Sequence, residues 1–173
     1  EAAVNVQVEM ACYTNQKTLK TELVITDAAG NEVARQTEDL VFNRKMRTCE
    51  YPLKEVKLTN PKLWDCEHPH LYTAKVTIYH ENGEVADCVT ERFGVRSLEF
   101  SPKFGMKLNG KKILLKGIAN HHSLGALGSA AYPRAIEKRI QMLKEFGVNH
   151  IRTSHNPYSE EFMYLADKYG IMV

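Results

Sequence analysis

Two short polar runs contain the residues of this chain whose chemistry could serve a binding or catalytic site. The first run is Asn120, His121 and His122, and the second, residues 152–156, has the sequence Arg-Thr-Ser-His-Asn. Each run follows a short apolar segment that is typical of a buried strand. Imidazole and guanidinium groups at such positions suit ligands that are rich in hydroxyl groups or that carry negative charge.

Other chemistry fits these two runs less well. A zinc site built from His121, His122 and His155 is disfavoured, because adjacent histidines on an extended segment point to opposite sides and no acidic ligand is near in the sequence. A serine hydrolase site is also disfavoured, because Ser154 is not in a nucleophile elbow and cannot form the required pair with its neighbour. The alternative to a binding role, for each histidine taken alone, is that it is a loop residue whose side chain bonds to the backbone.

The elements after residue 100 are expected to alternate between strand and helix. A hairpin at Asn109-Gly110 leads into a strand that ends near residue 118, and a helix opens at Pro133 and ends at Gly147. A strand over 148–151, a helix over 159–170 and the start of a further strand follow. This order implies parallel strands with right-handed crossovers. Neighbouring parallel strands lie about 5 Å apart, so the two polar runs are expected to meet at one edge of the sheet.

The first hundred residues have a different pattern, in which apolar and polar residues alternate in short runs separated by turns. Turn signals occur at residues 27–31 and at Asn82-Gly83, where both central residues of a tight hairpin could take positive φ. About seven strands of this kind predict an immunoglobulin-like β-sandwich. The fold class is therefore α+β in two parts: a sandwich over 1–98, and over 99–173 the N-terminal portion of a TIM barrel, an incomplete (β/α)8 segment of the form βαβαβ.

Composition restricts the partners. The 173 residues are 43% hydrophobic and 25% charged, with a formal net charge of +2. This charge is too small to favour nucleic acid, and no apolar run is long enough to span a bilayer. The chain begins at Glu1 without a signal-like segment, so it is expected to be a piece of a longer protein, and its compartment stays open. Its four cysteines, at positions 12, 49, 66 and 88, form no C-x-x-C pair, which favours free thiols.

Residues 149–173 resemble the first signature of glycoside hydrolase family 2, which includes β-galactosidases, β-glucuronidases and β-mannosidases. The positions in register with the family pattern are Asn149, Ile151, Arg152, Thr153, Ser154, His155, Pro157, Asp167 and Gly170. One departure is Asn156, where the family pattern has tyrosine.

The resemblance extends toward the N-terminus. Residues 62–72 resemble a segment of the family's immunoglobulin-like domain, and residues 92–96 resemble the connection from that domain into the barrel. Residues 108–117 resemble the surroundings of the first barrel strand, after which His121 aligns with a substrate-contacting histidine. Ser123 stands where a related pattern has an acid. The match is good over 60–173, whereas the first sixty residues match by strand pattern alone.

What the resemblance implies is a retaining, exo-acting β-glycosidase that hydrolyses terminal β-linked sugars. Its two catalytic glutamates are expected beyond Val173, so the chain alone is expected to be inactive. His121, Arg152, His155 and Asn156 would bind the sugar or orient the nucleophile. A β-galactosidase is favoured; the alternatives are a β-glucuronidase and, from another class, a non-catalytic carbohydrate-binding or interaction module.

The resemblance implies a β-glycoside or oligosaccharide as the partner, and neither nucleic acid nor a membrane. The visible residues require no cofactor and predict no metal ligand, while a need for Mg or Na elsewhere in the protein stays open. A homo-oligomer also stays open.

Overall fold

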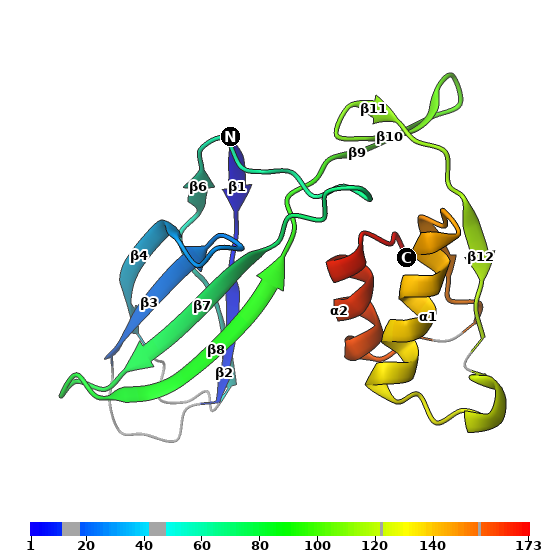
Figure 1. The fold of residues 1–173 in the computed structure, drawn as a ribbon. Helices are drawn as coiled ribbons and strands as arrows, with labels where there is room; N and C mark the ends of the chain where they lie inside the picture. Colours follow the sequence, from blue (N-terminus) through cyan, green and yellow to red (C-terminus); the bar gives the residue numbers. More distant parts are fainter. Residues whose placement is uncertain (12–17, 42–47, 122, 156) are drawn as a thin grey trace. The chain divides into compact units, whose positions relative to one another are not determined.

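The computed structural model describes residues 1–11, 18–41, 48–121, 123–155 and 157–173. These residues form two compact units: residues 1–62 with 72–93, and residues 63–71 with 94–173. An antiparallel β-sandwich region is followed by a β/α segment, which confirms the predicted fold class (Figure 1). The domain division at residue 98 stays a prediction, and the compact units depart from it in two respects, because residues 63–71 and residues 94–98 pack with the second unit.

The described part of the first unit contains eight strands in three antiparallel sheets (Figure 1). The strands are β1 (Ala2–Val4), β2 (Gln7–Ala11), β3 (Thr18–Thr26), β4 (Glu32–Val41), β5 (Thr48–Pro52), β6 (Val56–Leu58), β7 (Tyr72–Tyr79) and β8 (Val85–Phe93). The largest sheet has the order β4-β3-β7-β8, and the two smaller sheets are β2-β5 and β1-β6.

Strand β3 shows why this unit folds as a sandwich. Leu19, Leu23 and Ile25 alternate with more exposed residues, and all three are buried, as the period of two predicts. Leu40 of the neighbouring strand β4 and Ile78 of β7 are buried too. One face of the sheet therefore provides the apolar core of the unit.

The turn at Asn82-Gly83 differs from the prediction of two positive φ angles. Gly83 has a φ of 84°, but Asn82 is not among the residues with positive φ. The register of β7 and β8 shifts at Ile78/Tyr79, so the connection is a longer loop with a bulge, in which one residue of positive φ is sufficient. The second Asn-Gly pair does have the two-residue geometry, with φ of 52° at Asn109 and 75° at Gly110.

The second unit contains a three-stranded antiparallel sheet, a parallel strand pair and two α-helices (Figure 1). Its elements are β9 (Leu98–Ser101), β10 (Gly105–Leu108), β11 (Lys111–Lys112), β12 (Gly117–Ala119), the 3-10 helix η1 (Gly125–Leu127), α1 (Pro133–Glu145), β13 (His150–Arg152) and α2 (Glu160–Tyr169). Met172 adds a parallel bridge to His150, so the predicted order of parallel strands is confirmed. Within the described residues, no helix has the length and apolar character needed to cross a membrane.

Both helices begin and end where the sequence predicts. Pro133 is the first residue of α1, and the Ser159 hydroxyl accepts a hydrogen bond from Phe162 N (3.3 Å) at the start of α2. Gly170 ends α2 with a φ of 70°. The two helices pack on each other, with Ile140 of α1 and Phe162 of α2 in a shared core. Met163 of α2 faces away from this core and is 42% exposed.

The strand predicted over residues 113–118 is shorter in the structure. Strand β12 starts at Gly117, and Leu114 is exposed. The side chain of Asn149 binds the preceding backbone instead: its Oδ1 accepts from Lys116 N (2.8 Å) and its Nδ2 donates to Leu114 O (3.0 Å). A side-chain amide thus takes the place of strand hydrogen bonds, which a pattern of apolar residues cannot reveal.

Residues 63–71 lie within the range predicted for the sandwich, but they pack with the second unit through Trp64. This side chain is 1% exposed, and its indole N–H donates to Asp167 O at 2.9 Å. Asn109 Nδ2 donates to Trp64 O (3.0 Å), and the Arg96 guanidinium lies 4.8 Å from the centre of the indole ring. A Cβ on Gly94 would lie 2.9 Å from Trp64 Cβ, so this contact favours glycine at position 94.

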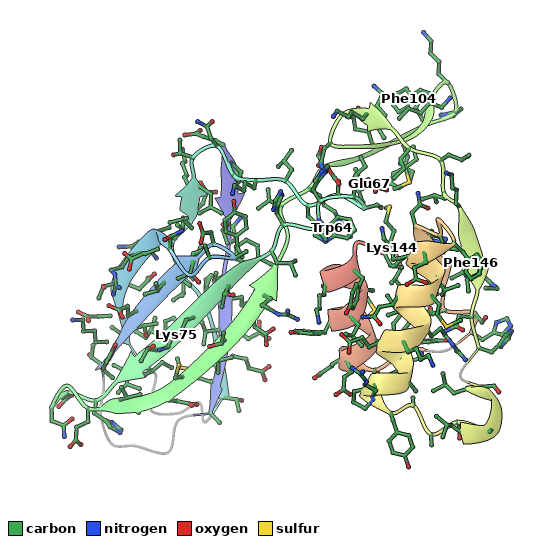
Figure 2. The ribbon with its side chains drawn as sticks, viewed as in Figure 1. Trp64, Glu67, Lys75, Phe104, Lys144 and Phe146 are labelled. Atoms are coloured by element: carbon green, nitrogen blue, oxygen red, sulfur yellow. The ribbon has the colours of Figure 1, made fainter. Side chains whose placement is uncertain are left out.

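The same segment also contacts the ends of the two helices through Cys66. Lys144, labelled in Figure 2, lies near the end of α1. Its Nζ donates to Cys66 O at 2.6 Å. A Cβ on Gly170 would lie 2.4 Å from Cys66 O. Gly170 is therefore required twice, for its positive φ and for this close approach. Cys66 and Cys88 have free thiols, and Cys12 lies outside the described residues.

Removing the Trp64 side chain is expected to destabilise the second unit selectively. We expect Trp64→Ala to cost about 3–5 kcal/mol, the usual range for a large buried aromatic side chain. Amide hydrogen exchange would measure this as faster exchange at Ile151, whose N–H donates to Met172 O, with a smaller change at Ile25 of β3. Leu23→Ala, at an equally buried site of the first unit, is the control and should show the reverse pattern. Equal losses at both amides in Trp64→Ala would contradict this assignment.

Candidate functional site

The candidate site lies where β12 and β13 end. These strands are parallel and in register, with Ile118 opposite Ile151 and Ala119 opposite Arg152. The pairing continues beyond the strands, because Asn120 N donates to Arg152 O at 2.8 Å. The two polar runs therefore start at the same edge of the sheet, as the sequence predicts.

His121 and His155 come together above this edge. Their ring centres are 6.2 Å apart and their planes are tilted by 56°. Both side chains are exposed, as is that of Arg152. None of these three side chains makes a hydrogen bond or ion pair with a described residue. His122 and Asn156 lie outside the described residues, so the predicted role of Asn156 has no structural counterpart here.

The backbone at Ser154 returns the second run toward the first. Ser154 has a φ of 54°, which is uncommon for a residue with a side chain. Its hydroxyl donates to Asn120 O at 2.9 Å and so holds the turn on the end of the neighbouring strand. Such local strain persists where the surrounding structure fixes it. The consequence is that His155, the next residue, lies close to His121.

Two further side chains reach Asn120 from the helical layer. Tyr158, which precedes α2, donates its hydroxyl to Asn120 O at 2.7 Å, and burial raises the pKa of this phenol. Arg139 of α1 donates to Asn120 Oδ1 (2.9 Å) and to Ser123 O (2.7 Å). No sequence signal assigned Arg139 or Tyr158 to the site, since each is a single polar residue in or beside an amphipathic helix.

A pocket of about 130 Å³ lies beside these residues. Its walls are largely apolar and come from both helices and the loop after β12, while its polar lining comes from the site network. The main lining residues are His121, Leu124, Ile136, Arg139, Tyr158 and Phe162. The described residues contain no group of three or more histidine, cysteine or acidic side chains that could hold a metal ion. The exposed imidazole and guanidinium groups of this arrangement can bind polar or anionic ligand groups.

Comparison with known protein families gives the class to which this chain belongs. The family model "Glycosyl hydrolases family 2" matches residues 1–96, and the model of the TIM barrel domain of the same family matches residues 103–173. The chain belongs to glycosyl hydrolase family 2.

Curated relatives have two activities in their names. A β-galactosidase from Bacteroides ovatus is 36% identical over 157 residues, which cover 86% of this chain and 17% of the relative. A β-glucuronidase from Bacteroides fragilis is 29% identical, covering 99% of this chain and 24% of the relative. The chain thus spans a quarter or less of the length of these relatives.

Solved structures agree on the fold. A family 2 glycosyl hydrolase from Bacteroides cellulosilyticus is 31% identical and superposes with a TM-score of 0.89, covering 98% of this chain and 23% of that structure. A β-glucuronidase from Parabacteroides merdae is 28% identical, with a TM-score of 0.83, covering 98% of this chain and 21% of that structure.

Removal of the Ser154 hydroxyl should destabilise the second unit by about 1 kcal/mol, the usual contribution of one hydrogen bond. Ser154→Gly should lose less than Ser154→Ala, because glycine takes a φ of 54° without strain. Urea unfolding followed by the fluorescence of Trp64, the one tryptophan of the sequence, reports on this unit. Ser97→Ala, at an exposed serine outside the site, is the matched control and should change stability by less than about 0.5 kcal/mol. Equal losses in the alanine and glycine variants would argue against strain at this position.

Proposed function

We propose that the protein containing this chain is a retaining exo-β-glycosidase of the β-galactosidase type. The observation that carries the proposal is the pairing of His121 with His155 at the ends of two parallel strands, one of which ends at Arg152. In barrels of this kind the ligand site forms at the carboxyl ends of the strands. Family membership then supplies the reaction class.

The proposed roles follow from the chemistry of the three exposed side chains. A neutral imidazole offers one donor and one acceptor, so His121 and His155 suit the hydroxyl groups of a sugar. The guanidinium of Arg152 presents several donors in one plane and suits a carboxylate. In a retaining glycosidase that carboxylate is the nucleophile, whose charge and orientation Arg152 would maintain.

The two catalytic carboxyl groups are expected outside residues 1–173. They must face each other about 5–5.5 Å apart, and the acid needs a raised pKa. The pKa of Glu137 is shifted in the opposite direction, because hydrogen bonds from the Tyr169 hydroxyl and the Lys168 ammonium lower it. Glu160 and Glu161 are exposed in the first turn of α2. These carboxylates have structural surroundings rather than catalytic ones.

The identity of the sugar is the finer part of the proposal. The relatives named above are a β-galactosidase and β-glucuronidases, so the latter activity is the alternative. The deciding experiment compares nitrophenyl β-galactoside and nitrophenyl β-glucuronide as substrates of the full-length protein. Faster turnover of the galactoside, with NMR showing the β-anomer as first product, supports the proposal. Preference for the glucuronide favours the alternative, and an α-anomer as first product would exclude a retaining mechanism.

The isolated chain is expected to hydrolyse neither substrate. Without the carboxyl pair, neither protonation of the leaving group nor a glycosyl-enzyme can occur. The measurement is nitrophenol release by the purified chain from a host that lacks its own β-glycosidases, with the full-length protein as positive control. Turnover by the chain would show that the reaction uses residues within 1–173.

In the full-length protein, Arg152→Lys should lower kcat by about a hundredfold or more, because lysine cannot reproduce a planar two-donor contact with a carboxylate. The matched control is Arg134→Lys on α1, where the arginine side chain is 94% exposed and lies 3.9 Å from Glu137. It should keep wild-type kcat. A well-folded Arg152→Lys enzyme with unchanged kcat would remove Arg152 from the catalytic site and leave it a structural role.

A further inference from the structure

Asn120 joins four parts of the second unit. Its N–H donates to Arg152 O, its carbonyl oxygen accepts from the hydroxyls of Ser154 and Tyr158, and its side-chain oxygen accepts from Arg139 Nη1. All four donor–acceptor distances lie between 2.7 and 2.9 Å. The partners come from β13, from the loop after β13, from the residues before α2, and from α1. A residue with this many partners is fixed in position, and His121 is its neighbour in the chain.

The contact with Arg139 fixes the loop after β12 at two points. One guanidinium nitrogen donates to Asn120 Oδ1 and the other to Ser123 O. The two acceptors therefore lie before and after His121 in the chain. Arginine is always charged and its donors are held in one plane, which makes a two-point contact rigid. The side chain of Arg139 is partly buried, so loss of an acceptor would leave a donor poorly solvated.

Asn120 also fixes the position of the second histidine, His155. Ser154 holds its positive φ with a hydrogen bond to Asn120 O, and His155 follows directly. One residue thus sets the backbone before His121 and the turn before His155. The 6.2 Å separation of their ring centres depends on both connections.

We propose that Asn120, held by Arg139, is a positioning residue that sets the His121–His155 pair for sugar binding. The proposal rests on the glycosidase function proposed above, because it assigns the pair to the sugar. Asn120 does not touch the sugar: it acts through the two loops. The side-chain oxygen is the necessary part, since the backbone groups are present whatever residue stands at position 120.

The first experiment uses two substitutions of Asn120 in the full-length protein. Asn120→Leu keeps the branching at Cγ but removes the acceptor, and it should lower kcat/KM by about tenfold or more, the size expected when catalytic contacts are misplaced. Asn120→Asp keeps an acceptor for Arg139 and should stay within about threefold of wild type. If both variants lost activity equally, the side-chain oxygen would have no positioning role.

A double-mutant cycle separates positioning from general destabilisation. His121→Ala should be costly in the wild-type background and much less costly in Asn120→Leu, because the histidine is already misplaced there. A variant that was merely less stable would show additive losses. Additive losses would overturn the proposal.

A third measurement does not depend on activity. Crystal structures of the full-length wild-type and Asn120→Leu proteins should show a changed separation of the His121 and His155 rings, and an unchanged separation would overturn the proposal. If the wild-type protein hydrolysed no glycoside, the proposed function would fail while the ring separation would still test the positioning. If Asn120→Leu did not fold, Arg139→Lys, which cannot reach Asn120 Oδ1 and Ser123 O together, provides the same comparisons.

Discussion

The parallel pairing of β12 with β13 is the constraint on which the rest of the second unit depends. Its register places Ala119 opposite Arg152, and a shift by one residue would turn Arg152 to the other face of the sheet. Two local features hold this register. A Cβ on Gly117 would lie 2.5 Å from His150 Nδ1, so glycine allows the strands to approach. The Asn149 amide binds the backbone just before β12. The register of these two short strands therefore decides which side chains face the core and which face the candidate site.

Burial gives this small sheet its stability. Ile151 is fully buried beneath Ile140 of α1 and Phe162 of α2, in a core that both helices share. Three-residue strands make few ladder bonds, so the helices and their apolar side chains must supply most of the favourable free energy. At the other end of the helices, residues 63–71 add Trp64 to a second cluster with Met172. The site is thus fixed from below by apolar packing and from within by the hydrogen bonds of Asn120.

The sequence predicts those features that local residues determine. Pro133, Ser159 and Gly170 mark helix ends by their own conformational preferences, and period-two alternation marks β3. The meeting of the two polar runs was also predictable, because parallel strands share an edge. Contacts between distant residues could not be predicted in this way. The Asn149 amide replaces strand pairing at 114–116, and Trp64 donates to Asp167, 103 residues later, so the segment around it packs with the second unit.

The polar groups of the site are of two kinds: those that form hydrogen bonds with other described residues and those that do not. The Asn120 side-chain oxygen, the Ser154 hydroxyl and the Arg139 guanidinium form hydrogen bonds with one another or with nearby backbone. The side chains of His121, Arg152 and His155 are exposed and make no such bond with the described residues, so their donors and acceptors remain open to a ligand. Three of the four residues that the family resemblance assigned to substrate or nucleophile are these open ones. Under the proposed function, the groups bonded within the protein would shape the site and the open groups would bind the ligand.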